Sequence, residues 1–266
     1  MFRRAGLIIA TALGVLAPAL PAAADPPIVV VAHRGASAYA PENTVAALRL
    51  AAWLGADMVE LDVQQTRDRE LVLMHDPTLA RTTDAEHVFP GRSPWRVADF
   101  TLAEIRRLDA GSWFGDRSEP VPTLGEALRA MAGTGLGLLL EVKTPHLYPG
   151  IESRTATELR RWWGGRPVVV QSFDRNAMRR FAATMPGVPI GLLGTPAMGE
   201  LAALARFADQ VNPPYETVTG DYIRRLHAFG LEVFTWTVND VPTLRRLVSQ
   251  GVDGVITDRP DLTGRT

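Results

Sequence analysis

Residues 59–76 read VELDVQQTRDRELVLMHD and contain two strand-like halves joined by a short polar connection. Glu60 and Asp62 are two positions apart, so on a β-strand both carboxylates lie on one face. The apolar run 71–74 predicts a second strand. The connection 65–70 is too short for a helical crossover, which needs a dozen or more residues, so the two strands are expected to form a hairpin.

The position of the hairpin turn determines which side chains meet across the two strands. A turn at Asp68 and Arg69 would place His75 opposite Asp62, because the midpoint of the two positions falls between the turn residues. Glu60 lies on the same face as Asp62. The segment therefore predicts one patch that holds two carboxylates and an imidazole, with the turn setting the register of His75.

Apolar strands and amphipathic helices alternate along most of the remaining chain. The predicted parallel strands are 28–32, 58–63, 138–143, 168–172, 190–193, 210–212, 232–238 and 254–257. The predicted helices between them are 44–53, 124–131, 152–163, 175–184, 199–207, 221–229 and 241–250. Eight strands in βα alternation predict an α/β fold, a (β/α)8 TIM-type barrel. An open doubly wound sheet is the alternative, but no Gly-rich phosphate turn follows the first strand.

An irregular segment of about 77–122 follows the hairpin and interrupts the alternation. It contains several Gly and Pro residues, the aromatic residues Trp95, Trp113 and Phe114, and one short predicted helix at 101–108. Long excursions of this kind are usually functional, so it is expected to form a lid or a wall of a pocket.

The first 24 residues have the pattern of a secretory signal peptide. Arg3 and Arg4 precede an apolar run to Leu20, and an A-x-A site predicts cleavage after Ala24. A transmembrane anchor is the alternative, but the run is shorter than about 20 residues and contains Pro18. The mature protein is expected to be exported, either secreted or held in the cell envelope or periplasm, without stable insertion in the membrane.

Length and composition limit the remaining possibilities. Residues 25–266 suit a single large domain, and barrels of this size are common. The formal net charge of −1 gives no positive excess of the kind that nucleic-acid binders carry. The chain has no cysteine, which excludes disulfides, zinc–thiolate sites and thiol nucleophiles.

Reactive side chains gather where the predicted strands end, which is where barrel active sites lie. They are His33, Arg34, Glu60, Asp62, His75, Glu141 and Lys143, with Gln171, Asn212 and Trp236 at further strand ends. Each one alone has an ordinary structural explanation, such as a solvated charge or a core histidine with its hydrogen bonds satisfied. Three acids, two histidines, an arginine and a lysine at one rim would need partners or a ligand to offset their desolvation.

The three acids point to a metal ion. Glu60, Asp62 and Glu141 supply hard oxygen ligands, without the histidine or thiolate richness that zinc prefers. Such oxygen donors suit one divalent cation, Ca²⁺ or Mg²⁺, with water and substrate oxygens completing its shell.

The four remaining side chains point to phosphoester cleavage. Arg34 and Lys143 add fixed positive charge, which together with a divalent cation would clamp a phosphate. Histidine is the residue type that ordinarily changes charge near neutral pH, so His33 and His75 are the natural pair for proton transfer. A phosphodiester held in this way between two imidazoles would be cleaved.

In combination and in this order, the motifs resemble those of the glycerophosphodiester phosphodiesterase family over nearly the whole mature chain. They are His33-Arg34-Gly35, Pro41-Glu42-Asn43-Thr44, Glu60-Leu61-Asp62-Val63, His75-Asp76, Glu141-Val142-Lys143, Gln171-Ser172-Phe173, Trp236-Thr237-Val238-Asn239 and residues 254–260. The resemblance implies a barrel with an inserted segment after the second strand, and no position that the family uses for chemistry departs from its pattern.

The resemblance also implies roles for individual residues. His33 and His75 would be the acid–base pair, the three acids would bind the metal, Arg34 and Lys143 would contact the phosphate, and Trp236 would face the glycerol. One histidine would act on water or on the adjacent glycerol 2-hydroxyl, which gives a cyclic phosphate that is then hydrolysed. The products would be glycerol 3-phosphate and an alcohol such as choline or ethanolamine.

Two other functions remain open from the sequence. A barrel enzyme of the phospholipase C or D type would act on lipid or lysolipid phosphodiesters, and Trp95, Trp113 and Phe114 could form an apolar rim for it. A binding protein that captures glycerophosphodiesters without cleaving them is the other, although it would not need both histidines. The oligomeric state and the head-group preference are also open.

Overall fold

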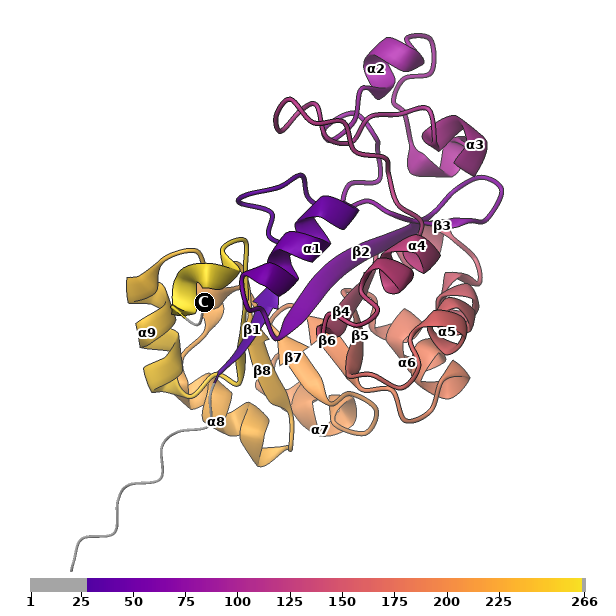
Figure 1. The fold of residues 1–266 in the computed structure, drawn as a ribbon. Helices are drawn as coiled ribbons and strands as arrows, with labels where there is room; N and C mark the ends of the chain where they lie inside the picture. The colour runs from indigo at the N-terminus through magenta and orange to yellow at the C-terminus, as the bar shows by residue number, and fades with distance from the viewer. Residues whose placement is uncertain (1–27, 265–266) are drawn as a thin grey trace, which may run out of the picture.

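Eight parallel strands close into a barrel in the computed structural model, which describes residues 28–264 (Figure 1). The predicted signal peptide lies outside these residues. The strands are β1 (Val29–Ala32), β2 (Met58–Gln65), β4 (Gly137–Val142), β5 (Val168–Ser172), β6 (Ile190–Leu193), β7 (Gln210–Asn212), β8 (Glu232–Thr235) and β9 (Gly254–Thr257). Their order is β1-β9-β8-β7-β6-β5-β4-β2, and pairing of β1 with β2 closes the ring. The predicted barrel is confirmed, and the open sheet is excluded.

Helices cover the outside of the barrel (Figure 1). They are α1 (Val45–Trp53), α4 (Leu124–Ala130), α5 (Ile151–Trp162), α6 (Arg175–Thr184), α7 (Leu201–Leu204), α8 (Gly220–Ala228) and α9 (Val241–Gln250), with short 3-10 turns η2 (Pro145–Leu147), η3 (Met198–Glu200), η4 (Tyr215–Thr217) and η5 (Pro260–Thr263). The helix predicted at 199–207 is therefore a 3-10 turn followed by one α-helical turn. Over residues 28–264, no helix has the length and apolarity needed to cross a membrane.

Local sequence signals fix where several helices begin. The Thr44 hydroxyl accepts the backbone N–H of Ala47 and caps α1, and Thr123 forms a capping box with Glu126 at the start of α4. Asp240 caps α9. These caps satisfy N–H groups that the first helical turn leaves without intrahelical partners.

A small cluster of apolar side chains packs together inside the barrel. They are Val31, Met58, Leu139, Phe234 and Ile256, all at most 9% exposed. Gly254 is required beside them, because a Cβ there would lie 2.7 Å from the Phe234 ring.

The predicted hairpin is present and stands outside the barrel ring. β3 (Leu71–Leu73) pairs antiparallel with β2 and with no other barrel strand. On its far edge, the N–H of Leu73 donates to the carbonyl of Pro122, where the inserted segment returns to the barrel. The inserted segment is thus anchored to the hairpin at its end.

The predicted register of the hairpin is wrong by one residue. The pairing is centred on Asp68, so Met74 and not His75 lies opposite Asp62, and the Met74 N–H donates to the Asp62 carbonyl at 3.0 Å. The cause is a three-residue turn in which Arg69 adopts φ +69°, the left-handed conformation that commonly closes such loops. A non-glycine residue at this position gives little sequence signal for that turn.

Residues 77–122 form a small lobe with its own core. Its helices are α2 (Ala85–Val88), η1 (Val97–Asp99) and α3 (Leu102–Ile105). Thr101 forms a capping box with Glu104 as the sequence indicates, but α3 ends earlier than the predicted helix. Buried Phe100 and Ile105 pack here against Val72 and Met74 of the hairpin. Figure 1 shows this lobe beyond the β3 end of the barrel.

Candidate active site

A cavity of about 140 Å³ lies at the carboxyl-terminal end of the barrel. Seven of the eight predicted site residues line it: His33, Arg34, Glu60, His75, Glu141, Lys143 and Trp236. The eighth, Asp62, is only 1% exposed and makes close contacts with Arg34 and Lys143. The structure therefore brings all eight predicted residues to one place.

The three acids form a compact cluster because their strands are in register. Asp62 of β2 is paired with Glu141 of β4, and Glu60 lies two residues earlier on the same face of β2. One carboxylate oxygen from each residue lies within 4.8 Å of the others, and all three residues are buried. This geometry can hold a single cation between the three side chains.

Backbone and amide groups hold two of these acids in place. The side chain of Asn43 donates to Asp62 Oδ2 at 2.8 Å and accepts the Asp62 N–H at 3.1 Å. The Arg34 N–H donates to Glu60 Oε2 at 2.9 Å. Asn43 adopts φ +58°, a conformation that Asn tolerates better than most residues. Asn43 stands in a motif of the family resemblance, but its contact with Asp62 was not predicted from the sequence.

The electrostatics of the cluster favour a bound cation. Burial, followed by the charges of Asp62 and Glu141, raises the pKa of Glu60 well above its usual range. Burial and the charge of Asp62 raise the pKa of Glu141 to about 7. Asp62 Oδ1 is buried and has no hydrogen-bond partner among residues 28–264. The cluster therefore suits a divalent cation such as Ca²⁺ or Mg²⁺. Its carboxylates are hard oxygen donors that repel one another, and Asp62 Oδ1 lacks a hydrogen bond within the described residues.

Two cationic side chains lie between the acids and the cavity. Lys143 Nζ is 2.8 Å from Glu141 Oε1 and 3.5 Å from Asp62 Oδ1. Arg34 Nε is 3.4 Å from Asp62 Oδ2, and its Nη1 donates to Glu42 Oε1 at 3.0 Å. Burial alone would raise the pKa of Asp62, but the positive charges of Lys143 and Arg34 outweigh it and lower this pKa. Both cations also face the cavity, where they can bind an anionic group.

Each predicted histidine has a carboxylate partner on the same ring nitrogen. His33 Nδ1 lies 2.6 Å from Asp258 Oδ1, and His75 Nδ1 lies 2.6 Å from Asp76 Oδ1. A carboxylate at Nδ1 fixes the tautomer and the orientation of an imidazole. Nε2 of each ring is left to exchange a proton with a molecule in the cavity.

The carboxylate behind His33 is itself held by several donors. Ser37 Oγ donates to Asp258 Oδ1 at 2.8 Å, and Asn239 Nδ2 donates to Asp258 Oδ2 at 2.6 Å. Burial alone would raise the pKa of Asp258, but His33 and these two donors outweigh it and lower this pKa to about 2. Asn239 and Asp258 both stand in motifs of the family resemblance, but no contact of either with His33 was predicted from the sequence. Nothing in their spacing links them to His33, more than 200 positions away.

His75 reaches the cavity through the backbone beyond β3 and not through the strand register. The Gln64 side-chain amide donates to the carbonyls of Met74, His75 and Asp76. The buried Tyr148 hydroxyl donates to Gln64 Oε1 at 2.7 Å and completes this anchor. Burial, against the attraction of Asp62, lowers the pKa of His75, so its imidazole is neutral and able to accept a proton at pH 7.

Substituting Tyr148 tests this anchor. Tyr148→Phe is expected to lower the free energy of unfolding by about 1–3 kcal/mol, because a buried amide oxygen of Gln64 loses its donor. Urea denaturation measures the change. Tyr39→Phe is the control, since the Tyr39 hydroxyl donates to exposed Asp261 and its loss should change stability little. Equal stabilities of the two variants would contradict the assigned role.

Two aromatic side chains form the apolar side of the cavity. Phe173 and Trp236 meet edge to face with ring centroids 6.2 Å apart. Trp236 Nε1 donates to the Asn212 carbonyl at 2.8 Å, which fixes the indole. Phe173 is 57% exposed, an unusual position for a large apolar residue, and the sequence interpretation missed it as a site residue.

The expectation that residues 77–122 form a wall of the pocket is wrong for this cavity. None of the described residues that line it belongs to that segment. Trp95 donates to the Phe89 carbonyl and packs within the lobe, and Trp113 and Phe114 stack on each other at its surface. The lobe is stabilised by its own core and by the hairpin, so it stands beside the cavity.

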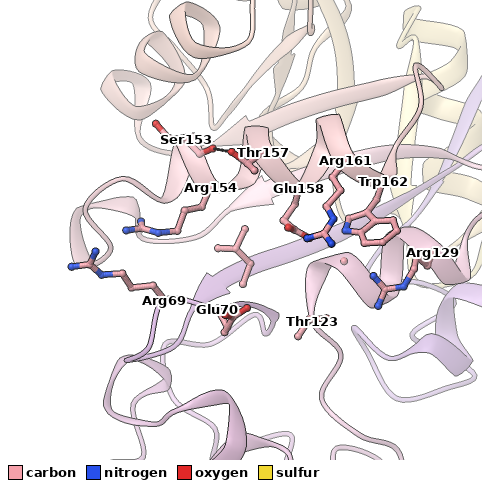
Figure 2. A pocket seen from close by; sticks show the side chains of 12 residues that line it. Arg69, Glu70, Thr123, Arg129, Ser153, Arg154, Thr157, Glu158, Arg161 and Trp162 are labelled. Carbon is pink, nitrogen blue, oxygen red and sulfur yellow. Dashed lines mark hydrogen bonds between the residues drawn. The ribbon is translucent and has the colours of Figure 1, made fainter.

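A larger hollow, about 440 Å³, lies on the outside of the barrel (Figure 2). It is bounded by the β2–β3 hairpin, α4 and α5, and Figure 2 shows Arg69 and Arg154 along one side and Arg129 beside Trp162 on the other. Among the described residues that line it there is no histidine and no cluster of acids. The acid cluster and the two carboxylate-paired histidines lie at the smaller cavity, at the end where barrel active sites lie.

Comparison with known proteins identifies relatives of the whole domain. The model of the glycerophosphoryl diester phosphodiesterase family matches residues 33–262. YhdW of Bacillus subtilis is 40% identical over 239 residues, which cover 87% of this chain and 95% of YhdW. A glycerophosphodiester phosphodiesterase of Caldanaerobacter subterraneus is 37% identical over 237 residues, with 87% and 94% covered.

A solved structure has the same fold and a ligand. A phosphodiesterase of Oleispira antarctica, in complex with the product sn-glycerol-3-phosphate, superimposes with a TM-score of 0.80 at 32% identity. The match covers 88% of this chain and 94% of that one. The similarity therefore extends over the entire barrel.

Proposed function

The chain belongs to the glycerophosphoryl diester phosphodiesterase family, and from this premise we propose that it hydrolyses glycerophosphodiesters by metal-dependent acid–base chemistry. The products are glycerol 3-phosphate and an alcohol. One observation carries the proposal: a buried cluster of three acids, two cations and two carboxylate-oriented histidines share one small cavity. A site that only captured the diester would have no use for two oriented imidazoles.

Glu60, Asp62 and Glu141 are the residues that would hold the metal, either Ca²⁺ or Mg²⁺. When bound, the ion supplies positive charge that stabilises the phosphate oxygens as negative charge develops on them. The fit rests on the oxygen-only donor set and on Asp62 Oδ1, which is buried without a hydrogen-bond partner among the described residues.

The protein side chains bind the diester and move its protons. Arg34 and Lys143 bind the non-bridging oxygens and orient the phosphorus. One histidine accepts a proton at Nε2 from the attacking water or from the glycerol 2-hydroxyl, and the other donates a proton to the departing alcohol. In the second route the 2-hydroxyl displaces the alcohol, and water then opens the cyclic phosphate.

Trp236 and Phe173 give the cavity an apolar side opposite its charged one. We assign Trp236 to contact with the glycerol carbons, because its ring lines the cavity while its Nε1–H is already bonded to the Asn212 carbonyl. A small cavity with a single aromatic side suits a water-soluble diester better than two acyl chains.

Hydrolysis of glycerophosphocholine tests the proposal, with Ca²⁺ and Mg²⁺ assayed separately and release of glycerol 3-phosphate measured. We expect this diester to be cleaved and phosphatidylcholine and lysophosphatidylcholine to be cleaved far more slowly. Faster cleavage of either lipid would favour the phospholipase-like alternative. Tight binding of glycerophosphocholine without turnover would identify a binding protein.

We also propose that the enzyme is exported. The proposal rests on the sequence of residues 1–24 alone, since the structure does not describe them. Mass spectrometry of the protein recovered from cells tests it, because cleavage after Ala24 gives a chain that begins at Asp25. A chain that retains residues 1–24 would contradict it.

A further inference from the structure

One residue of the inserted segment contacts the groups behind the cavity although it does not line the cavity itself. Arg81 Nε lies 2.5 Å from Asp76 Oδ2, while its Nη1 and Nη2 donate to the two oxygens of Glu42 at 2.9 and 2.6 Å. The guanidinium thus binds two carboxylates at once, Asp76 through Nε and Glu42 through Nη1 and Nη2.

Each of these carboxylates has a second partner in the site. The other oxygen of Asp76 lies 2.6 Å from His75 Nδ1. Glu42 Oε1 also accepts a hydrogen bond from Arg34 Nη1 at 3.0 Å. A continuous chain of charged contacts therefore runs from Arg34 through Glu42, Arg81 and Asp76 to His75. It links the cation that binds the phosphate to an imidazole that transfers a proton.

We propose that Arg81 is a positioning residue, which holds Asp76 against His75 and Glu42 against Arg34 and so sets the distance between the two functional side chains. The inference rests on the proposed function of His75 and Arg34. It also gives the inserted segment a role, because Arg81 belongs to this lobe and holds Asp76 and Glu42 in place from outside the cavity.

The contacts require an arginine in particular. Three guanidinium nitrogens make three separate contacts in one plane, whereas the ammonium of a lysine is a single point that cannot reach both carboxylates in that way. Glu42 is only 10% exposed and lies between two arginines, so removing Arg81 leaves a nearly buried carboxylate with one of its three arginine donors. Arg81 itself is 43% exposed and can be reached by a small solute.

The test compares Arg81→Ala and Arg81→Lys with Arg106→Ala. Arg106 is a matched control, because it belongs to the same lobe and pairs with a carboxylate outside it, Glu126, at 2.5 Å. We expect Arg81→Ala to lower kcat/KM for glycerophosphocholine roughly 10- to 100-fold, the range for groups that orient a functional side chain. Arg81→Lys should recover little of this loss. Arg106→Ala should retain wild-type kinetics.

Chemical rescue separates a positioning role from a general loss of structure. Guanidinium ion at non-denaturing concentration should restore part of kcat in Arg81→Ala and have no such effect on wild type or Arg106→Ala. The loss caused by Arg81→Ala should also shrink in an Asp76→Asn background, because both changes act through His75. Wild-type kinetics in Arg81→Ala, or losses that multiply fully in the double variant, would overturn the inference.

A spectroscopic measurement keeps this result separate from the proposed function. The His75 Nδ1 proton, bonded to Asp76, should give an NMR resonance that is absent in His75→Ala. Its resonance should shift or disappear in Arg81→Ala and remain unchanged in Arg106→Ala. An unchanged resonance in Arg81→Ala would refute the positioning role even if the wild type hydrolyses the diester. Failure of the wild type to hydrolyse it would refute only the function.

Discussion

His75→Ala and His33→Ala are each expected to lower kcat about 10²- to 10⁴-fold, the contribution of a positioned general acid or base. Both rings line the cavity, and each is bonded at Nδ1 to a carboxylate that fixes its orientation. Neither ring belongs to the apolar core, so the melting temperature should change little. Steady-state kinetics and thermal unfolding of the same preparations measure both quantities.

A third histidine gives the matched control for these variants. His87 lies in the inserted lobe, is exposed and does not line the cavity, so His87→Ala should have wild-type kcat. If His33→Ala or His75→Ala turned over substrate at the wild-type rate, that residue would have no part in proton transfer. If all three variants lost activity together with stability, the loss would come from unfolding.

Exhaustive chelation is expected to abolish activity, and Ca²⁺ or Mg²⁺ should restore it. The buried oxygens of Glu60, Asp62 and Glu141 lie within 4.8 Å of one another, and among the described residues two cationic side chains, Arg34 and Lys143, form ion pairs with these acids. Glu141→Gln and Asp62→Asn should raise the metal concentration needed for half-maximal activity. Full activity after EDTA treatment and dialysis would exclude a metal held by these acids.

The same cluster predicts how the metal-free protein responds to pH. Burial raises the pKa of Glu141 to about 7 and that of Glu60 well above its usual range, so the folded state binds their protons more tightly than the unfolded chain does. This contribution to stability is present at low pH and is lost as the pH rises from the ordinary glutamate value through about 7. Added metal should therefore raise the melting temperature more at pH 8 than at pH 5, measured by thermal unfolding with and without EDTA. An equal increase at both values would contradict this.

The barrel could be predicted from the sequence because its signals are local. Continuous apolar runs such as 29–32 identify strands buried on both faces, and capped amphipathic helices alternate with them. Strand ends then place His33, Glu60 and Glu141 at one rim, which the structure confirms. Closure of the ring follows from the strand count.

The details that were missed depend on backbone conformation or on contacts between distant residues. The observed hairpin register differs from the predicted one by one residue, because Arg69 adopts a left-handed backbone conformation. An arginine in the sequence does not indicate that conformation. Asp258 meets His33 across 225 positions, and Arg81 meets Glu42 across 39. Trp95 of the inserted lobe packs against the lobe's own core, and Trp113 and Phe114 lie exposed at its surface, so none of the three lines the cavity.

The proposed function requires one cavity that combines a metal-binding acid cluster with two proton-transferring histidines. Phosphorus-31 NMR of glycerophosphocholine incubated with the wild-type enzyme tests it most directly, first with EDTA and then with excess Mg²⁺ or Ca²⁺, alongside His75→Ala. We expect an intact diester under EDTA, glycerol 3-phosphate after metal is added to the wild type, and almost no glycerol 3-phosphate with the variant. Product under EDTA, or equal rates in wild type and His75→Ala, would contradict it.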